Sequence, residues 1–203
     1  MKNKITCQSL LKLYAQQKKS VPEIAKHFNC SENKINYWLN KYRIPKRTIS
    51  EAIYIKHNPQ GDPFKFVPPQ NLKEAKLFGI GLGLYWGEGN KANKNTIRLG
   101  NTDDRLLKIF IKFLIKFFKI RKNDLKFHLH IFTDIDVNEA KQYWMSKLNI
   151  KEKQIYKPLI SKSGSIGTYR EKSKYGVMTL YYGNTKLRNL LIDMIAGLDS
   201  SEG

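Results

Sequence analysis

The chain has 203 residues, and its 37 Lys and Arg residues against 17 Asp and Glu give a net charge of +20 and a pI near 9.9. This length can hold one sizeable domain and a small one. The excess of positive charge indicates a polyanionic partner, with nucleic acid as the first candidate and an acidic membrane surface as the second.

Several classes of protein lack support in the sequence. The longest apolar run is far shorter than the about 20 residues that span a bilayer, so we expect no transmembrane segment. Of the two polyanionic candidates we expect nucleic acid and no membrane. Residues 1–6 are polar and lack the core of a signal peptide, so we expect a cytoplasmic protein, nucleoid-associated or nuclear if eukaryotic. Cys7 and Cys30 have no partners at disulfide or zinc spacing. Motifs for nucleotide hydrolysis, acyl transfer and zinc proteolysis are absent from the sequence.

Residues 1–47 predict three short helices. An apolar stripe marks the first, and Ser20 with Glu23 three residues on predicts a capping box that starts the second. Asn29 precedes the third helix and tolerates the left-handed conformation that a tight turn needs. The expected core residues are Ile24, Ala25, Phe28, Cys30, Ile35 and Trp38.

This pattern resembles the helix-turn-helix modules that precede resolvase, transposase and homing endonuclease domains. The resemblance implies that the third helix touches bases and phosphates of DNA. A three-helix interaction module is the alternative, but residues 1–50 hold eleven Lys and Arg against two Asp and Glu. The expected DNA contacts of this helix are Ser31, Glu32, Asn33, Asn36, Tyr37 and Lys41.

A basic segment and a linker follow the third helix. Arg43, Lys46 and Arg47 surround Pro45, which suits an arm that lies along phosphates or in the minor groove; a plain exit turn is the alternative. Residues 48–70 contain four prolines and a glycine with balanced charge, so we expect a linker there.

The run Leu77–Gly89 predicts an apolar helix. Gly79, Gly83 and Gly87 recur every four residues and share one helix face. Glycine inside a helix costs about 0.5 to 1 kcal/mol relative to alanine, so this spacing indicates the close approach of another helix. The run ends on Glu88, a carboxylate at the negative end of the helix dipole, and a divalent cation shared with backbone carbonyls would remove the conflict. A buried helix followed by a solvated Glu is the alternative.

Residues 81–89, Gly-Leu-Gly-Leu-Tyr-Trp-Gly-Glu-Gly, resemble the signature of LAGLIDADG homing endonucleases in the variant that ends Gly-Glu-Gly. In that family two signature helices pack across a twofold or pseudo-twofold axis, and the last acid of each binds the catalytic metal. The resemblance therefore implies that Glu88 and Gly87 hold Mg²⁺ or another divalent cation. It also implies a homodimer through the glycine face, because the chain has one such helix.

Two positions depart from the family pattern. Trp86 stands where the family often has its first Asp, and Gly81 stands where it has Leu. The metal-binding acid is the later one, so these departures weaken the recognition more than the chemistry.

For residues 71–198 we expect an α+β, LAGLIDADG-like mixed domain, in which the signature helix joins an antiparallel sheet and packing helices, and for 199–203 a tail. The triplet Gly-Asn-Thr at 100–102 recurs at 183–185, each time between a strand and a helix, which indicates a duplicated unit. Thr102 is the expected helix cap. The expected strands span 96–100, 125–132, 154–160 and 175–182, and the later helices span 103–119, 136–148 and 185–197.

Basic residues lie in two loops of this domain and on a strand. Lys91 and Lys94 follow the signature, while Lys162, Arg170 and Lys172 stand among hydroxyls and glycines, a composition that suits phosphate contacts. A solvated hairpin loop explains the second loop equally well. Two histidines, His128 and His130, share a strand face and are expected to contact solvent or phosphate. The family uses a basic residue near the metal, and Lys174 or Arg98 would take that role.

These patterns together predict a site-specific double-stranded DNA endonuclease with metal-dependent phosphodiester hydrolysis. The helix-turn-helix would extend the recognised site. The alternative is a non-cleaving, sequence-specific transcriptional regulator built on the same fold. Glu88 favours the enzyme, whereas Trp86, Gly81 and the added helix-turn-helix favour the regulator.

Overall fold

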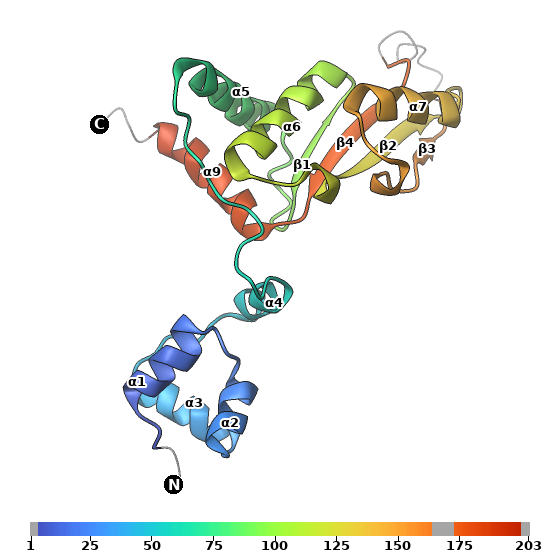
Figure 1. The fold of residues 1–203 in the computed structure, drawn as a ribbon. Coiled ribbons are helices and arrows are strands. Elements are labelled where there is room, and N and C mark those ends of the chain that lie inside the picture. Colours follow the sequence, from blue (N-terminus) through green and yellow to red (C-terminus); the bar gives the residue numbers. More distant parts are fainter. Residues whose placement is uncertain (1–3, 164–172, 200–203) are drawn as a thin grey trace. The chain divides into compact units, whose positions relative to one another are not determined.

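The computed structural model describes residues 4–163 and 173–199 (Figure 1). Backbone contacts divide the chain into two units, Met1–Pro63 and Phe64–Gly203. The boundary follows residue 63 and so falls inside the predicted linker at residues 48–70. Residues 48–63 belong to the first unit, and residues 64–70 belong to the second.

The first unit is built on three helices around a small core. α1 (Cys7–Leu10) continues as a π-helix over Leu11–Gln16, and α2 (Val21–Phe28) and α3 (Glu32–Lys41) follow. The buried residues are Leu10, Leu13, Tyr14, Ile24, Ala25, Ile35, Leu39 and Ile44, with Phe28, Cys30 and Trp38 packed against them. All six expected core residues are therefore confirmed.

The local signals between these helices are also confirmed. The Ser20 hydroxyl accepts from the Glu23 N–H at 3.4 Å, and the Ser20 N–H donates to the Glu23 carboxylate at 2.7 Å. Asn29 adopts the left-handed conformation with φ of 49°. Ser31 caps α3 by accepting from the Lys34 N–H at 3.3 Å. These contacts set the turn between α2 and α3.

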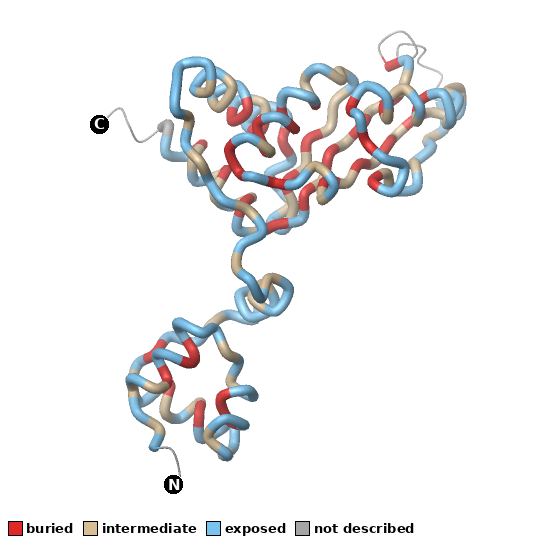
Figure 2. The backbone as a smooth tube through the Cα atoms, viewed as in Figure 1, coloured by how far each residue is buried: buried red, intermediate tan, exposed pale blue. Residues whose placement is uncertain are grey.

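A helix that the sequence analysis did not predict, α4 (Ile49–His57), occupies the first half of the linker segment. Thr48 and Glu51 form a capping box, in which the Thr48 N–H donates to the Glu51 carboxylate at 2.7 Å. The prolines that suggested a linker begin only at Pro59, after the helix has ended. No residue of α4 is buried, as Figure 2 shows.

The second half of that segment packs on the C-terminal unit. The N–H groups of Lys65 and Val67 donate to the carbonyls of Phe118 and Phe117 at 3.0 and 2.7 Å. The ring of Phe66 lies 5.5 Å from that of Phe118. These bonds satisfy carbonyls that the end of a helix leaves without intrahelical partners.

The second unit places helices against one four-stranded sheet (Figure 1). It begins with the signature helix, which is longer at its start than the predicted run. The elements are α5 (Leu72–Glu88), β1 (Ile97–Asn101), α6 (Asp104–Phe118), β2 (Lys126–Phe132), α7 (Val137–Leu148), β3 (Leu159–Ser161), β4 (Val177–Tyr182) and α9 (Thr185–Asp199).

The sheet is mixed, so the prediction of an antiparallel sheet holds for β1, β4 and β2 and is wrong for β3. Its order is β1-β4-β2-β3, and β4 pairs antiparallel with both β1 and β2. β3 pairs parallel with β2 because α7 crosses over between them and returns the chain in the same direction. The strand expected over 154–160 reduces to a bridge at Ile155 and the short β3.

The core of this unit lies between one sheet face and the helices. α6 buries an aromatic stripe that includes Phe110, Phe113 and Phe117, and β2 buries Phe127, Leu129 and Ile131. The other face of β2 carries Lys126, His128 and His130, as its alternation predicts. The side chains of this second face are only partly buried.

The cap of α6 differs from the prediction. Asp103, not Thr102, is the cap, since its carboxylate accepts from the Arg105 N–H at 2.8 Å. Asn101 accepts from the Asp103 N–H at 2.9 Å. In the second copy of the triplet, Asn184 itself accepts from the Leu187 N–H at 2.9 Å. A carboxylate follows the first triplet and a lysine follows the second, and α6 starts two residues later relative to its triplet than α9 does.

Across the described ranges, each helix is too short or too polar to pass through a bilayer.

Candidate nucleic-acid interface

The signature helix presents one unpartnered face. A Cβ atom added at Gly79, Gly83 or Gly87 would meet nothing within 4 Å, so these glycines line open space within a single chain. Large apolar side chains flank them: Ile80 and Trp86 are each 51% exposed. The close approach to another helix of the same chain occurs on the opposite side of α5, where α6 packs.

The end of α5 carries Glu88 on the surface. Gly89 ends the helix, and its N–H donates to the Tyr85 carbonyl at 3.0 Å. The next residue, Asn90, donates to the Arg98 carbonyl at 2.9 Å, and Gly89 bridges β1 at Leu99. The backbone that follows the helix is therefore hydrogen-bonded to the first strand, and Glu88 is exposed just before this junction.

Basic groups surround this helix end. The Lys91 ammonium donates to the Trp86 carbonyl, and the Lys91 carbonyl accepts from the Arg188 guanidinium at 2.5 Å. The buried Tyr85 hydroxyl lies near the same guanidinium. Burial raises the pKa of Tyr85, and the positive charge of Arg188 offsets part of that rise. A lysine thus provides the positive charge that the dipole at this end favours.

The oxygen atoms at this helix end are of the type that binds a hard cation, but they are too few to form a complete metal site. The Glu88 carboxylate and the Gly87 carbonyl are oxygen ligands of the type that Mg²⁺ prefers. Among the described residues, no three His, Cys, Asp or Glu side chains are grouped as metal ligands. A cation at this helix end would therefore need ligands beyond the side chains that the described part of one chain supplies.

The open face of the sheet carries a row of basic and aromatic side chains. Arg98, Tyr181 and Lys126 are direct partners across β1, β4 and β2. Direct partners on neighbouring strands point to the same side of a sheet. His128 lies beside this row, opposite Thr179. Positive charge interleaved with rings suits contact with both phosphates and bases.

Tyr181 joins the members of this face. The Arg98 guanidinium lies 5.0 Å from the centre of its ring, and the rings of Tyr156 and His128 lie edge-on at 6.1 and 6.4 Å. His130 is held in a hydrogen bond with the Ser161 hydroxyl at 2.8 Å. The sequence analysis did not predict a site role for Lys126, Tyr156 or Tyr181. The alternation of polar and apolar residues along β2 and β4 is the signal that places Lys126 and Tyr181 on the open face.

Lys174 lies in a different setting from Glu88. Its ammonium sits 5.1 Å from the centre of the Tyr175 ring, and its pKa is raised by a hydrogen bond and charge interaction with the Tyr175 side chain. Tyr175 stacks on Tyr143 of α7 at 3.8 Å. Of the two basic candidates for the catalytic role, Lys174 contacts Tyr175, which stacks on α7, whereas Arg98 lies on β1 and contacts Tyr181 of β4.

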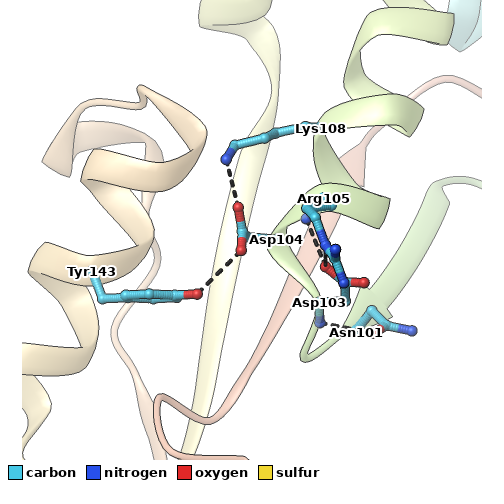
Figure 3. A network of polar contacts seen from close by, with 6 residues as sticks. All are labelled: Asn101, Asp103, Asp104, Arg105, Lys108 and Tyr143. Atoms are coloured by element: carbon cyan, nitrogen blue, oxygen red, sulfur yellow. Dashed lines mark hydrogen bonds and ion pairs between the residues drawn. The ribbon is translucent and has the colours of Figure 1, made fainter.

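The network around Tyr143 fastens α7 to the start of α6 (Figure 3). The Tyr143 hydroxyl donates to the Asp104 carboxylate at 3.1 Å, and the Lys108 ammonium donates to the other carboxylate oxygen. The hydrogen bond from Lys108 lowers the pKa of Asp104. Burial, followed by the hydrogen bond to Asp104, raises the pKa of Tyr143. This network serves the fold, because all its charges are paired.

The three-helix N-terminal unit leaves most of the predicted face of α3 exposed. Tyr37 is 58% exposed, and Asn36 is half-buried. The Lys41 ammonium lies 4.8 Å from the centre of the Trp38 ring. The remaining predicted contacts of α3 are exposed: Ser31, Glu32 and Asn33.

The predicted basic arm divides into two kinds of residue. Arg43 and Lys46 are exposed. The Arg47 guanidinium instead donates to the carbonyls of Lys18 at 2.8 Å and Tyr14 at 3.2 Å, and it also donates to Lys19. It lies 4.1 Å from the centre of the Tyr14 ring. Arg47 therefore fastens the arm to the first helix.

The other predicted phosphate contacts lie in loops. Lys91, Lys94 and Lys162 are exposed. Arg170 and Lys172 lie outside the described residues. No family model, curated protein or solved structure matches this chain.

Proposed function

We propose that this protein binds double-stranded DNA through both units and cuts it as a homodimer of the LAGLIDADG type, with Glu88 as the metal-binding acid. One observation carries the proposal: Glu88 ends, on the surface, the same helix whose glycine face is open in the single chain. A second copy packed on that face would bring two Glu88 carboxylates together.

The order of elements supports the resemblance to that family. α5 is followed by a short pairing of Gly89 with β1 and then by α6, and β2 and β4 pair before α9. This order resembles two hairpins that are each followed by a helix, in which the first pairing is a single bridge and α7 and β3 are inserted between β2 and β4. The open sheet face with Arg98, Tyr181 and Lys126 would lie on DNA.

The open face of α5 supports a homodimer as the functional form. Leu72, Ile80 and Trp86 are 72%, 51% and 51% exposed and flank the glycines. A helix with small residues at i and i+4 lets a second backbone approach closely, and the flanking apolar groups would leave water on association. The two copies would be related by a twofold axis, since each offers the same face.

A cation held by the two Glu88 carboxylates would supply charge stabilisation to a phosphate under attack by water. Residues of the chain would bind and position the DNA backbone around the cut. Exposed Lys91 and Lys94, with Arg98, would bind the phosphates on either side of the cut. The tie between Asn90 and β1 fixes Glu88 relative to this basic row.

A second candidate function is sequence-specific regulation without cleavage, and the position of Lys91 favours it. Its ammonium already donates to the Trp86 carbonyl at the end of α5. The positive charge of Lys91 therefore stabilises the negative end of the α5 dipole without a metal. Glu88 would then be an exposed carboxylate with no metal to bind.

The test is incubation of the full chain with a randomised double-stranded DNA library and Mg²⁺, with recovery of cut ends and of bound, intact fragments. The endonuclease predicts staggered ends at one sequence, lost in Glu88→Gln while binding remains. Glu152→Gln is the matched control, because Glu152 is exposed and lies away from α5 in the α7–β3 connection.

The outcomes separate the two candidates. Bound but intact DNA with Mg²⁺, Mn²⁺ or Ca²⁺ would support the regulator and remove the metal role of Glu88. Cleavage that persists in Glu88→Gln would show that another residue is responsible.

A further inference from the structure

A groove of about 900 Å³ lies within the N-terminal unit, between α4 and the helix-turn-helix. Ile49, Ala52, Ile53 and Lys56 form one wall, at the spacing of a single face of α4. The opposite wall comes from the start of α2 and from Asn36 of α3. The groove therefore borders the face of α3 that is expected to read DNA bases.

The α4 wall is apolar and exposed to an unusual degree. Ile49 is 81% exposed and Ile53 is 52% exposed. The capping box of Thr48 and Glu51 holds this helix in shape although none of its residues is buried. A preformed helix that keeps two isoleucines in water gains free energy when an apolar surface covers them.

The rim of the groove is basic. Lys18, Lys19, Lys46 and Lys56 line it, whereas the one acid among its lining residues is Glu23. The Glu23 carboxylate is engaged by the N–H and hydroxyl of Ser20 in the capping box. The groove thus combines apolar walls with a cationic rim, a combination that suits a sugar-phosphate strand.

We infer that one strand of a DNA duplex passes through this groove, with α3 in the major groove on one side of it and Ile49 and Ile53 in the adjoining minor groove on the other. The inference rests on the proposed DNA-binding function. A single backbone strand separates the two grooves of a duplex, so elements on either side of the protein groove reach both. Apolar side chains wedged into the minor groove part base steps and bend the duplex.

The test uses the full chain and a duplex that it selects from a randomised library. Methylation interference at guanine N7 reports contacts in the major groove, and interference at adenine N3 reports contacts in the minor groove. We expect both, within about five base pairs of each other, because half a helical turn separates the grooves. We also expect a bend, measured by energy transfer between dyes at the duplex ends.

The double variant Ile49→Ala, Ile53→Ala should lose the adenine N3 interference and the bend but keep the guanine N7 interference. Its plot of log affinity against log salt should keep the wild-type slope, since no charge has changed. Lys46→Gln should instead lower that slope by about 1. The matched control is Leu11→Ala, which removes a 40% exposed apolar side chain outside the groove and should behave as wild type.

The outcomes distinguish this inference from the proposed function. A library that yields no bound DNA overturns both. Bound DNA without adenine N3 interference, or a double variant that keeps it, overturns this inference alone. A double variant that changes the oligomeric state without DNA would also overturn it, because the α4 face would then bind protein.

Discussion

Gly81 and Gly83 stand two residues apart on α5 and face different surroundings. A Cβ atom at Gly81 would lie 2.2 Å from the Phe113 ring and 2.7 Å from its Cβ, whereas one at Gly83 would meet nothing within 4 Å. Phe113 is fully buried and cannot retreat without disturbing the aromatic core. Glycine at position 81 therefore makes room for the core side chain of Phe113, whereas glycine at position 83 contacts no other part of the chain.

Gly81→Ala should lower the free energy of unfolding by about 1 to 3 kcal/mol, because overpacking forces the core to shift. Gly83→Ala should raise the stability of the monomer by about 0.5 to 1 kcal/mol, through the better helix propensity of alanine. Urea unfolding at a concentration where the protein is monomeric measures both. Equal effects at the two positions would contradict the packing of α5 on α6.

At the level of elements, the glycine face of α5 is open in the single chain. Gly83→Leu should leave each chain folded, since a Cβ atom at this exposed position meets no atom of the same chain within 4 Å, but it should keep a second α5 at a distance. Analytical ultracentrifugation should therefore find wild type as a dimer and the variant as a folded monomer. A variant that remains a dimer would place the interface elsewhere.

The attachment of α7 to α6 should give stability a dependence on pH. The pKa of Asp104 is lowered from its ordinary 3.8, first by the hydrogen bond from Lys108, so its contribution is present above that value and lost as pH falls through the folded pKa. The pKa of Tyr143 is raised above 10.0, first by burial, so its contribution is present below that value and lost as pH rises through the folded pKa.

Asp104→Asn should accordingly flatten the acid limb of a plot of Tm against pH, and Tyr143→Phe should flatten the alkaline limb. Asp193→Asn is the control, because Asp193 is exposed on α9. An acid limb that stays the same in Asp104→Asn would assign the acid sensitivity to other carboxylates.

The whole molecule carries a charge of +20, spread over both units. Log affinity for DNA should fall linearly with log salt, with a slope of about −0.9 for each phosphate neutralised. A chain that begins at Phe64 should keep α5 and the open sheet face but lose the contacts of α3 and the arm. Its slope, measured by fluorescence anisotropy, should be shallower than that of the full chain, and an unchanged slope would remove the N-terminal unit from the interface.

Much of this architecture follows from local patterns. The capping box at Ser20, the left-handed Asn29 and the alternation of β2 depend on residues close together in sequence, and each is confirmed. The sequence analysis did not predict α4, because the prolines at the end of that segment indicate a linker and the capping box at Thr48 was not considered. The parallel pairing of β3 was missed because strand neighbours depend on how α7 crosses the sheet.

The candidate site also combines local and long-range features. The sequence alone shows the excess of positive charge and the resemblance around Glu88. The row of Arg98, Tyr181 and Lys126 was not predicted, because it joins three strands that lie far apart in the chain. Sequence spacing also assigned Arg47 to phosphate, whereas the fold brings three carbonyls to its guanidinium.

The sequence by itself determined the basic charge, the three short helices of the first unit, the apolar helix α5 and the residues that the strands bury, because these depend on composition and on short-range periodicity. Tertiary structure alone decided which glycine meets a neighbour, which arginine is already bound and which side chains share the open sheet face. Those outcomes depend on contacts between distant segments, and only the folded chain brings those segments together.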